Sequence, residues 1–220
     1  MSLLMFLHQD DGAVILTDTL ATDTLGKPLD FVDKCVAVPS MNLAIATTGY
    51  QQLMLRWVER LRENVRARDT SMLDLHTPGS LREIWADIQR EHGPLEESAT
   101  IDHFGFDEHT GRCRRFAYRS ANDFESEEGE APAFGVKPDP LGDTQPDELS
   151  DAGLIDFAKR IRVEQDERTA DRIYIGGDLV LTEVRKNAVS SQRIYRWEDQ
   201  HDQWQAICDA PPLGAVARLP

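Results

Sequence analysis

Cysteine is scarce in this chain of 220 residues, and its spacing fits neither a metal site nor a disulfide framework. The three cysteines, Cys35, Cys113 and Cys208, are odd in number and far apart. A structural zinc site needs short spacings such as CxxC, and a disulfide-stabilised fold needs paired cysteines, so both are excluded. The six histidines are scattered too. We therefore expect no metal, no cofactor and a reducing, cytoplasmic compartment.

Positive charge and long apolar runs are also scarce. Lys and Arg number 24 against 39 Asp and Glu, which gives a net charge of −15. Phosphate binding needs clustered cations, and the arginines here are interleaved with acids, so we expect no nucleic-acid partner. No apolar run approaches the ~18 to 20 residues that span a bilayer. The opening MSLLMFLHQDD lacks the charged head and the cleavage-type tail of a signal peptide, so no membrane partner is expected either.

The most informative residues lie at the start of the chain. Ser2 follows Met1 directly, Asp18 comes sixteen residues later, and Lys34 sixteen residues after that. If Met1 is removed, Ser2 carries both a hydroxyl and a free α-amine, whose reference pKa is roughly 7.7 to 8.0. Such an amine can take the hydroxyl proton near neutral pH. The first residue could therefore supply a nucleophile and its base together.

Lys34 and Asp18 extend this chemistry. A lysine beside the Ser2 amine, held by an aspartate, would disfavour a second positive charge and so lower the pKa of the amine. Each residue taken alone has an ordinary explanation, because serine is common after Met1, aspartate is common at strand ends and lysine is usually solvated. The joint spacing of the three favours the catalytic interpretation.

The segments Asp10–Thr22 (DDGAVILTDTLAT) and Asn42–Tyr50 (NLAIATTGY), with Lys34 between them, resemble the start of a proteasome β subunit. That family belongs to the N-terminal nucleophile (Ntn) hydrolases. Counted from Ser2, the match needs no gap as far as Lys34. The resemblance implies catalytic roles for Ser2, Asp18, Lys34 and, as the oxyanion donor, Gly49, with Thr22 and Thr48 as substrate-binding residues.

The second half of the chain departs from the family pattern. That pattern has an Asp and a Ser shortly before a Gly-Gly pair, where they support the nucleophile. Here the pair is Gly176-Gly177, Ile175 stands in place of the Ser, and Asp171 is the nearest acid. The Gly-Ser-Gly turn of the family is absent. By resemblance, Asp171 is assigned the supporting role.

The sequence predicts an α+β fold, a four-layer αββα sandwich of two antiparallel sheets flanked by helices. We expect one domain over residues 1–197 and a tail over 198–220 that packs on its own domain or on a neighbouring subunit. The expected strands are residues 3–7, 13–17, 35–38, 43–47, 101–107, 112–119 and a hairpin over 172–197; helices are expected over 50–65, 81–92 and after a cap at Asp147 or Ser150; loops are expected over 70–80, 124–130 and 138–150.

The resemblance implies an N-terminal serine or threonine-type peptidase or amidase that acts on a peptide or amide substrate. It also implies a homo-oligomer, in which copies form a ring, and an ATP-driven unfolding partner. Two other functions stay open. The chain could be a non-catalytic scaffold or ring subunit, as Ile175 suggests, or a small-molecule amide hydrolase that works as a monomer or dimer.

Overall fold

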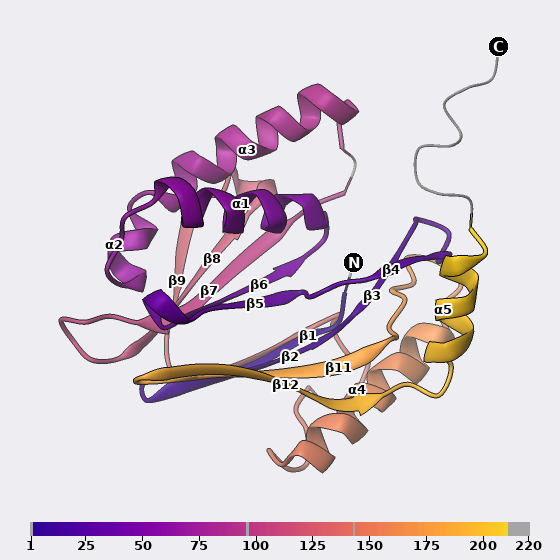
Figure 1. Cartoon of the computed structure of the whole chain (residues 1–220). Helices are drawn as coiled ribbons and strands as arrows, with labels where there is room; N and C mark the ends of the chain where they lie inside the picture. Colours follow the sequence, from indigo (N-terminus) through magenta and orange to yellow (C-terminus); the bar gives the residue numbers. More distant parts are fainter. Residues whose placement is uncertain (1, 96, 143, 211–220) are drawn as a thin grey trace.

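The protein is a sandwich of two five-stranded antiparallel sheets with helices on both outer sides (Figure 1). We describe it from a computed structural model, which covers residues 2–95, 97–142 and 144–210. The first sheet has the order β10-β1-β2-β11-β12. Its strands are β10 (Ala133–Lys137), β1 (Leu4–Gln9), β2 (Gly12–Asp18), β11 (Asp178–Arg185) and β12 (Ala188–Arg196).

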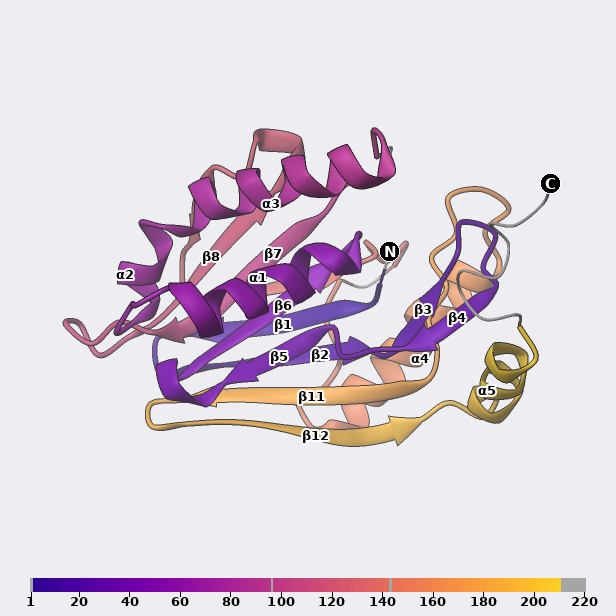
Figure 2. The ribbon, with the colours of Figure 1, turned by 45° about the horizontal axis from the view of Figure 1, so that its top comes forward.

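The second sheet stacks on the first and has the order β5-β6-β7-β8-β9. A separate two-stranded hairpin, β3-β4, lies at one end of the sandwich together with the last helix (Figure 2). The strands are β5 (Cys35–Val38), β6 (Leu43–Thr48), β7 (Thr100–Phe106), β8 (Cys113–Arg119), β9 (Ser126–Gly129), β3 (Leu20–Thr22) and β4 (Pro28–Phe31).

Helices cover the outer face of each sheet. Three of them lie over the β5–β9 sheet, a long helix covers the β1-containing sheet, and a short one packs on β4 (Figure 1). Among the described residues, no helix combines the length and the apolar character needed to cross a bilayer. The helices are α1 (Gln51–Asn64), α2 (Thr70–Asp74), α3 (Thr77–His92), α4 (Asp151–Asp166) and α5 (Gln200–Cys208), with short 3-10 turns at Pro39–Met41 and Ser120–Asn122.

Three apolar clusters hold the four layers together. Alternation along β6 shows how: Leu43 and Ile45 point to α1 and α3, whereas Ala44 and Ala46 point into the space between the sheets. The third cluster lies between the first sheet and α4. Since successive side chains of a strand point to opposite faces, a strand buried on both sides reads as a continuous apolar run. The four-layer architecture expected from the sequence is confirmed.

Most of the predicted elements are confirmed, with three corrections, the first of which is that the hairpin predicted over 172–197 begins only at Asp178. The segment 70–80, predicted as a loop, contains α2 and the start of α3, because Asp69 caps α2 by accepting a hydrogen bond from Met72 N at 2.7 Å. The acidic segment 124–130, predicted as a turn, contains the edge strand β9. The predicted cap is Ser150, whose hydroxyl accepts from Gly153 N at 3.2 Å. The prediction did not include β3, β4, β10 or α5.

Candidate active site

A buried ion pair forms the centre of the candidate site. Lys34 Nζ lies 2.7 Å from Asp18 Oδ1, and the side chains are only 4% and 0% exposed. Asp18 ends β2, and Lys34 directly precedes β5, so the pair connects the two sheets. Removing one partner of such a buried pair typically costs about 3–5 kcal/mol of stability, because an uncompensated charge is left behind. The expectation that Asp18 holds Lys34 therefore agrees with this contact.

Asp18 also holds the backbone on either side of the pair. Its Oδ1 accepts a hydrogen bond from Leu3 N at 3.0 Å, and its Oδ2 accepts one from Gly176 N at 3.2 Å. Lys34 Nζ donates a second bond to Leu20 O at 2.6 Å. The carboxylate therefore fixes the backbone just before β1 relative to Lys34, and Ser2 is the residue that precedes Leu3.

Burial changes the acidity of Lys34. Loss of hydration lowers the pKa of its ammonium below the usual value, and the Asp18 carboxylate acts against that shift. A buried lysine with a lowered pKa loses its proton more readily than a solvated one. The site therefore contains a buried ammonium whose charge is balanced by a single carboxylate.

Ser2 lies two residues before the start of β1 and is 7% exposed. Met1, whose removal the sequence interpretation requires, lies outside the described residues. Leu4 and Phe6 belong to the cluster between the sheets. Because side chains alternate along an extended chain, continuing this alternation places Ser2 on the same inner face as Leu4.

Gly49 follows β6 directly and has a backbone that only glycine tolerates well. Its φ is +90°, and a Cβ added there would lie 2.0 Å from Ser98 O. The two predicted substrate-binding threonines lie on neighbouring segments. Thr48, the last residue of β6, is 7% exposed, and Thr22, the last residue of β3, is half-buried.

Comparison with solved structures supports the architecture. The chain is similar to a structure of Anbu, an ancestral beta-subunit, from Yersinia bercovieri, with a TM-score of 0.58 and 11% identity over 97% of this chain and 99% of that one. A Gly-1 mutant of Anbu from Hyphomicrobium sp. strain MC1 gives a TM-score of 0.55 and 12% identity over 94% and 92%. No family model and no curated protein sequence matches the chain. The fold is proteasome-like.

The structure does not bring Asp171 to the site of this proteasome-like fold. Its side chain is exposed, and its backbone is left-handed, with a φ of 53°. Ile175, at the position where the family has a Ser, is 3% exposed and packs in the apolar cluster facing α4. The Gly-Gly segment therefore reaches Asp18 through the Gly176 backbone N–H instead of through a side chain.

The C-terminal helix supplies a site residue that the sequence interpretation missed. Gln203 of α5 accepts a hydrogen bond from Gly177 N through Oε1 at 2.9 Å, and its Nε2 donates to Asp199 Oδ2 at 2.9 Å. The two terminal nitrogens of Arg162, Nη1 and Nη2, in turn donate to the two carboxylate oxygens of Asp199. Gln203 lies 27 residues after Gly176, and no spacing rule points to it. The segment 198–210 thus packs on its own domain, while 211–220 lie outside the described residues.

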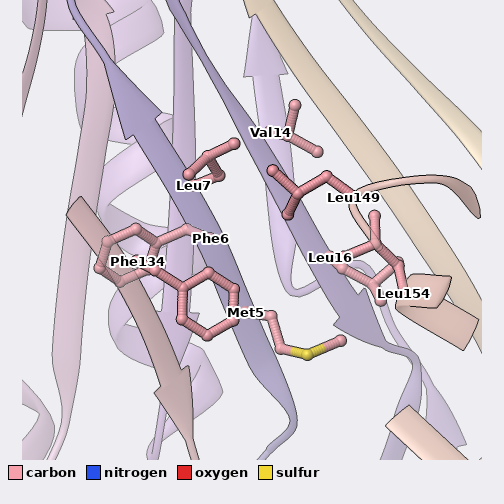
Figure 3. A pocket seen from close by; sticks show the side chains of 8 residues that line it. All are labelled: Met5, Phe6, Leu7, Val14, Leu16, Phe134, Leu149 and Leu154. Carbon is pink, nitrogen blue, oxygen red and sulfur yellow. The ribbon is translucent and has the colours of Figure 1, made fainter. Parts of the chain in front are cut away.

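The thiols of the chain add no second nucleophile to the site. Burial raises the pKa of the Cys35 and Cys113 thiols to about 12, which leaves both protonated and poor nucleophiles. No cluster of metal-ligating side chains occurs in the part of the chain that the structure describes. An apolar pocket lies between the first sheet and the segment leading into α4 (Figure 3). Its lining is purely hydrophobic: Met5, Phe6, Leu7, Val14, Leu16, Phe134, Leu149 and Leu154.

Proposed function

We propose that this chain is an N-terminal nucleophile hydrolase that cleaves a peptide or amide bond with Ser2 after removal of Met1. The observation that carries the proposal is the buried Asp18–Lys34 pair, whose carboxylate also binds the backbone N–H of Leu3. A purely structural ion pair would not need to bind the backbone N–H of Leu3, the residue that follows the potential nucleophile Ser2. The proteasome-like fold supports the same conclusion.

The proposed reaction starts with proton transfer inside Ser2. The free amine takes the proton of Oγ, and Oγ forms a bond to the substrate carbonyl carbon while the carbonyl electron pair moves to oxygen. The backbone N–H of Gly49 binds this oxyanion; one such donor typically contributes about 3–4 kcal/mol in the transition state. The C–N bond then breaks, and the Ser2 ammonium gives its proton to the departing amine.

Hydrolysis of the resulting ester completes the cycle. The Ser2 amine takes a proton from water, the hydroxide attacks the ester carbonyl, and the carboxylic acid leaves as Oγ regains a proton. The positive charge of Lys34, held by Asp18, disfavours protonation of the Ser2 amine, and Asp18 also holds Leu3 in place. Thr22 and Thr48 are the proposed contacts to the substrate backbone.

We also propose that the chain assembles with copies of itself. The Anbu structure from Yersinia bercovieri is described as that of an ancestral beta-subunit, and a ring of such subunits would enclose the site. An ATP-driven unfolding partner would deliver protein substrates to such a ring. A monomer or dimer would instead be consistent with a small-molecule amide hydrolase.

A second function is favoured by Ile175. Its apolar, buried side chain replaces a supporting hydroxyl of the family pattern, so the fold could serve as a non-catalytic scaffold. This alternative predicts that neither the wild type nor a variant without Ser2 hydrolyses any substrate.

The test compares hydrolysis of fluorogenic peptides and small amides by the wild type, Ser2→Ala and Ser190→Ala. Ser190 is an exposed serine of β12 and serves as the matched control. We expect Ser2→Ala to lose activity by about 10²-fold or more, because nucleophile and hydroxyl proton disappear together, and Ser190→Ala to keep it. Equal hydrolysis by the wild type and Ser2→Ala would contradict the proposal, and an inert wild type would favour the scaffold.

A further inference from the structure

Lys137 carries a half-buried positive charge with little compensation. Its Nζ donates one long hydrogen bond, to Thr100 Oγ1 at 3.3 Å. None of the carboxylates in residues 2–95, 97–142 and 144–210 lies within ion-pair distance of it. Lys34, by contrast, has Asp18 at 2.7 Å. Removing an ammonium from water without a close anion is costly, so this arrangement needs an explanation.

The position of Lys137 supplies that explanation. It ends β10, and its register partner on β1 is Leu4, two residues from Ser2. Side chains paired across antiparallel strands point to the same face, so Lys137 points, like Leu4, into the space between the sheets. Its ammonium reaches across that space to β7 of the other sheet.

Thr100, the residue it reaches, lies beside the other half of the site. Its register partner is Thr48, and Gly49 follows Thr48 directly. Thr48 and Thr100 both lie on the inner face, since Ala46 and Phe104 of the same strands belong to the inter-sheet cluster. The ammonium of Lys137 therefore lies between the strand end that carries Ser2 and the one that carries Gly49.

Of the four charged groups that act on Lys137, three are already paired, and the exposed Asp139 lies beyond ion-pair distance. Asp102 binds Arg115 at 2.6 Å, and Arg119 binds Glu127. Burial lowers the pKa of the Lys137 ammonium; Asp102 and Asp139 act against this shift, while Arg119 and Arg115 add to it. Lys137 thus has no close anion among the described residues and can bind an incoming one.

We propose that Lys137 binds a substrate carboxylate close to the scissile bond, so that the enzyme prefers acidic peptides or amides. A partly desolvated ammonium forms a charge-assisted hydrogen bond that is stronger than one between neutral groups. The hydroxyl of Thr100, which lies 3.3 Å from the ammonium, can donate to the second carboxylate oxygen. This inference names a substrate class and rests on the proposed function.

The test measures binding, so that it does not depend on turnover. Pairs of peptides that differ only in Glu against Gln, on either side of one amide bond, are titrated into Ser2→Ala by calorimetry. We expect the Glu peptide of at least one pair to bind about tenfold more tightly, and this preference to fall as salt is raised. Lys137→Met added to Ser2→Ala should abolish the preference, and Lys137→Arg should retain it.

Lys186→Met is the matched control, since Lys186 is an exposed lysine in the turn between β11 and β12. Urea unfolding of each variant separates loss of binding from loss of folding. Equal affinity for Glu and Gln peptides, or a preference that survives Lys137→Met, would overturn the inference. A wild type that binds Glu peptides selectively but never cleaves them would instead overturn the proposed function and leave the anion site standing.

Discussion

At the scale of single residues, the ammonium of Lys34 is the group on which the proposed chemistry depends most. It has two acceptors, Asp18 Oδ1 and Leu20 O, and water does not replace them because the side chain is 4% exposed. The methylene stem could be kept by methionine, but the positive charge could not. A substitution that preserves shape therefore separates packing from electrostatics.

We expect Lys34→Met to lower the rate of acylation by roughly 10²-fold or more, because the Ser2 amine loses the nearby positive charge that lowers its pKa. It should also lower the free energy of unfolding, since Asp18 is left buried without its cation. Stopped-flow acylation and urea unfolding measure the two effects, with Lys186→Met as an exposed control. Full acylation by Lys34→Met would remove the lysine from its assigned role.

A second prediction at this scale concerns His103 and the dependence of stability on pH. This histidine is fully buried, its Nε2 accepts a hydrogen bond from Trp57 Nε1 at 2.8 Å, and burial lowers its pKa to about 3. The folded pKa lies below the unfolded value near 6.5. Between these two pKa values the unfolded chain binds more protons than the folded chain. The stability that the folded state keeps with a neutral His103 is therefore complete above about pH 6.5 and is lost as the pH falls.

We therefore expect the stability of His103→Gln to fall less steeply than that of the wild type below pH 6.5. The difference in slope should approach about 1.4 kcal/mol per pH unit. Urea midpoints between pH 7.5 and 5.0 measure it, and the exposed His109 provides the control His109→Gln. His8, whose pKa burial also lowers, is unchanged in every variant. Parallel slopes for His103→Gln and the wild type would contradict the account.

At the scale of elements, α5 connects the end of the chain to the candidate site. Trp204 stacks on Phe31 of β4 with ring centroids 6.2 Å apart, and Gln203 binds the Gly177 backbone. A Cβ on Gly176 would lie 2.5 Å from Gln203 Nε2, so the helix and the glycine pair fit closely. The neighbouring N–H of Gly176 then reaches Asp18.

We expect Gln203→Ala to reduce acylation about tenfold, because Gly177 N loses its acceptor and the Gly176 contact to Asp18 loosens. Gln205→Ala is the matched control, since Gln205 lies on the same helix and bonds only the exposed Asp209. Acylation by both variants is compared in one assay across pH. Equal rates for the two would show that α5 does not position the site.

The elements also show what the sequence could and could not predict. Long periodic segments such as α1 and the β1-β2 hairpin were predictable, because their apolar residues recur with a clear period. The edge strand β9 was not, since its acidic residues are mostly exposed and show no alternation. The spacing of the sequence likewise predicted Asp18 and Lys34. Gln203 and Lys137 come to this region only through contacts between segments far apart in the sequence, which no spacing rule predicts.

At the scale of the whole molecule, the proposed ring makes a prediction about mass. One chain has a mass of 24.8 kDa. We expect sedimentation equilibrium to give a mass many-fold higher, consistent with a closed ring, at moderate salt that screens the net charge of −15. A mass of one or two chains would contradict the ring and favour the small-molecule amide hydrolase.

The most direct test of the central claim is the intact mass of the protein before and after treatment with a peptide epoxyketone. This reagent closes a ring only with a hydroxyl and a free amine on neighbouring carbons, which is what an amino-terminal Ser2 offers. We predict a protein lacking Met1 that gains one stoichiometric adduct, with no adduct on Ser2→Ala. A retained Met1, or a free Ser2 that stays unmodified, would contradict the account.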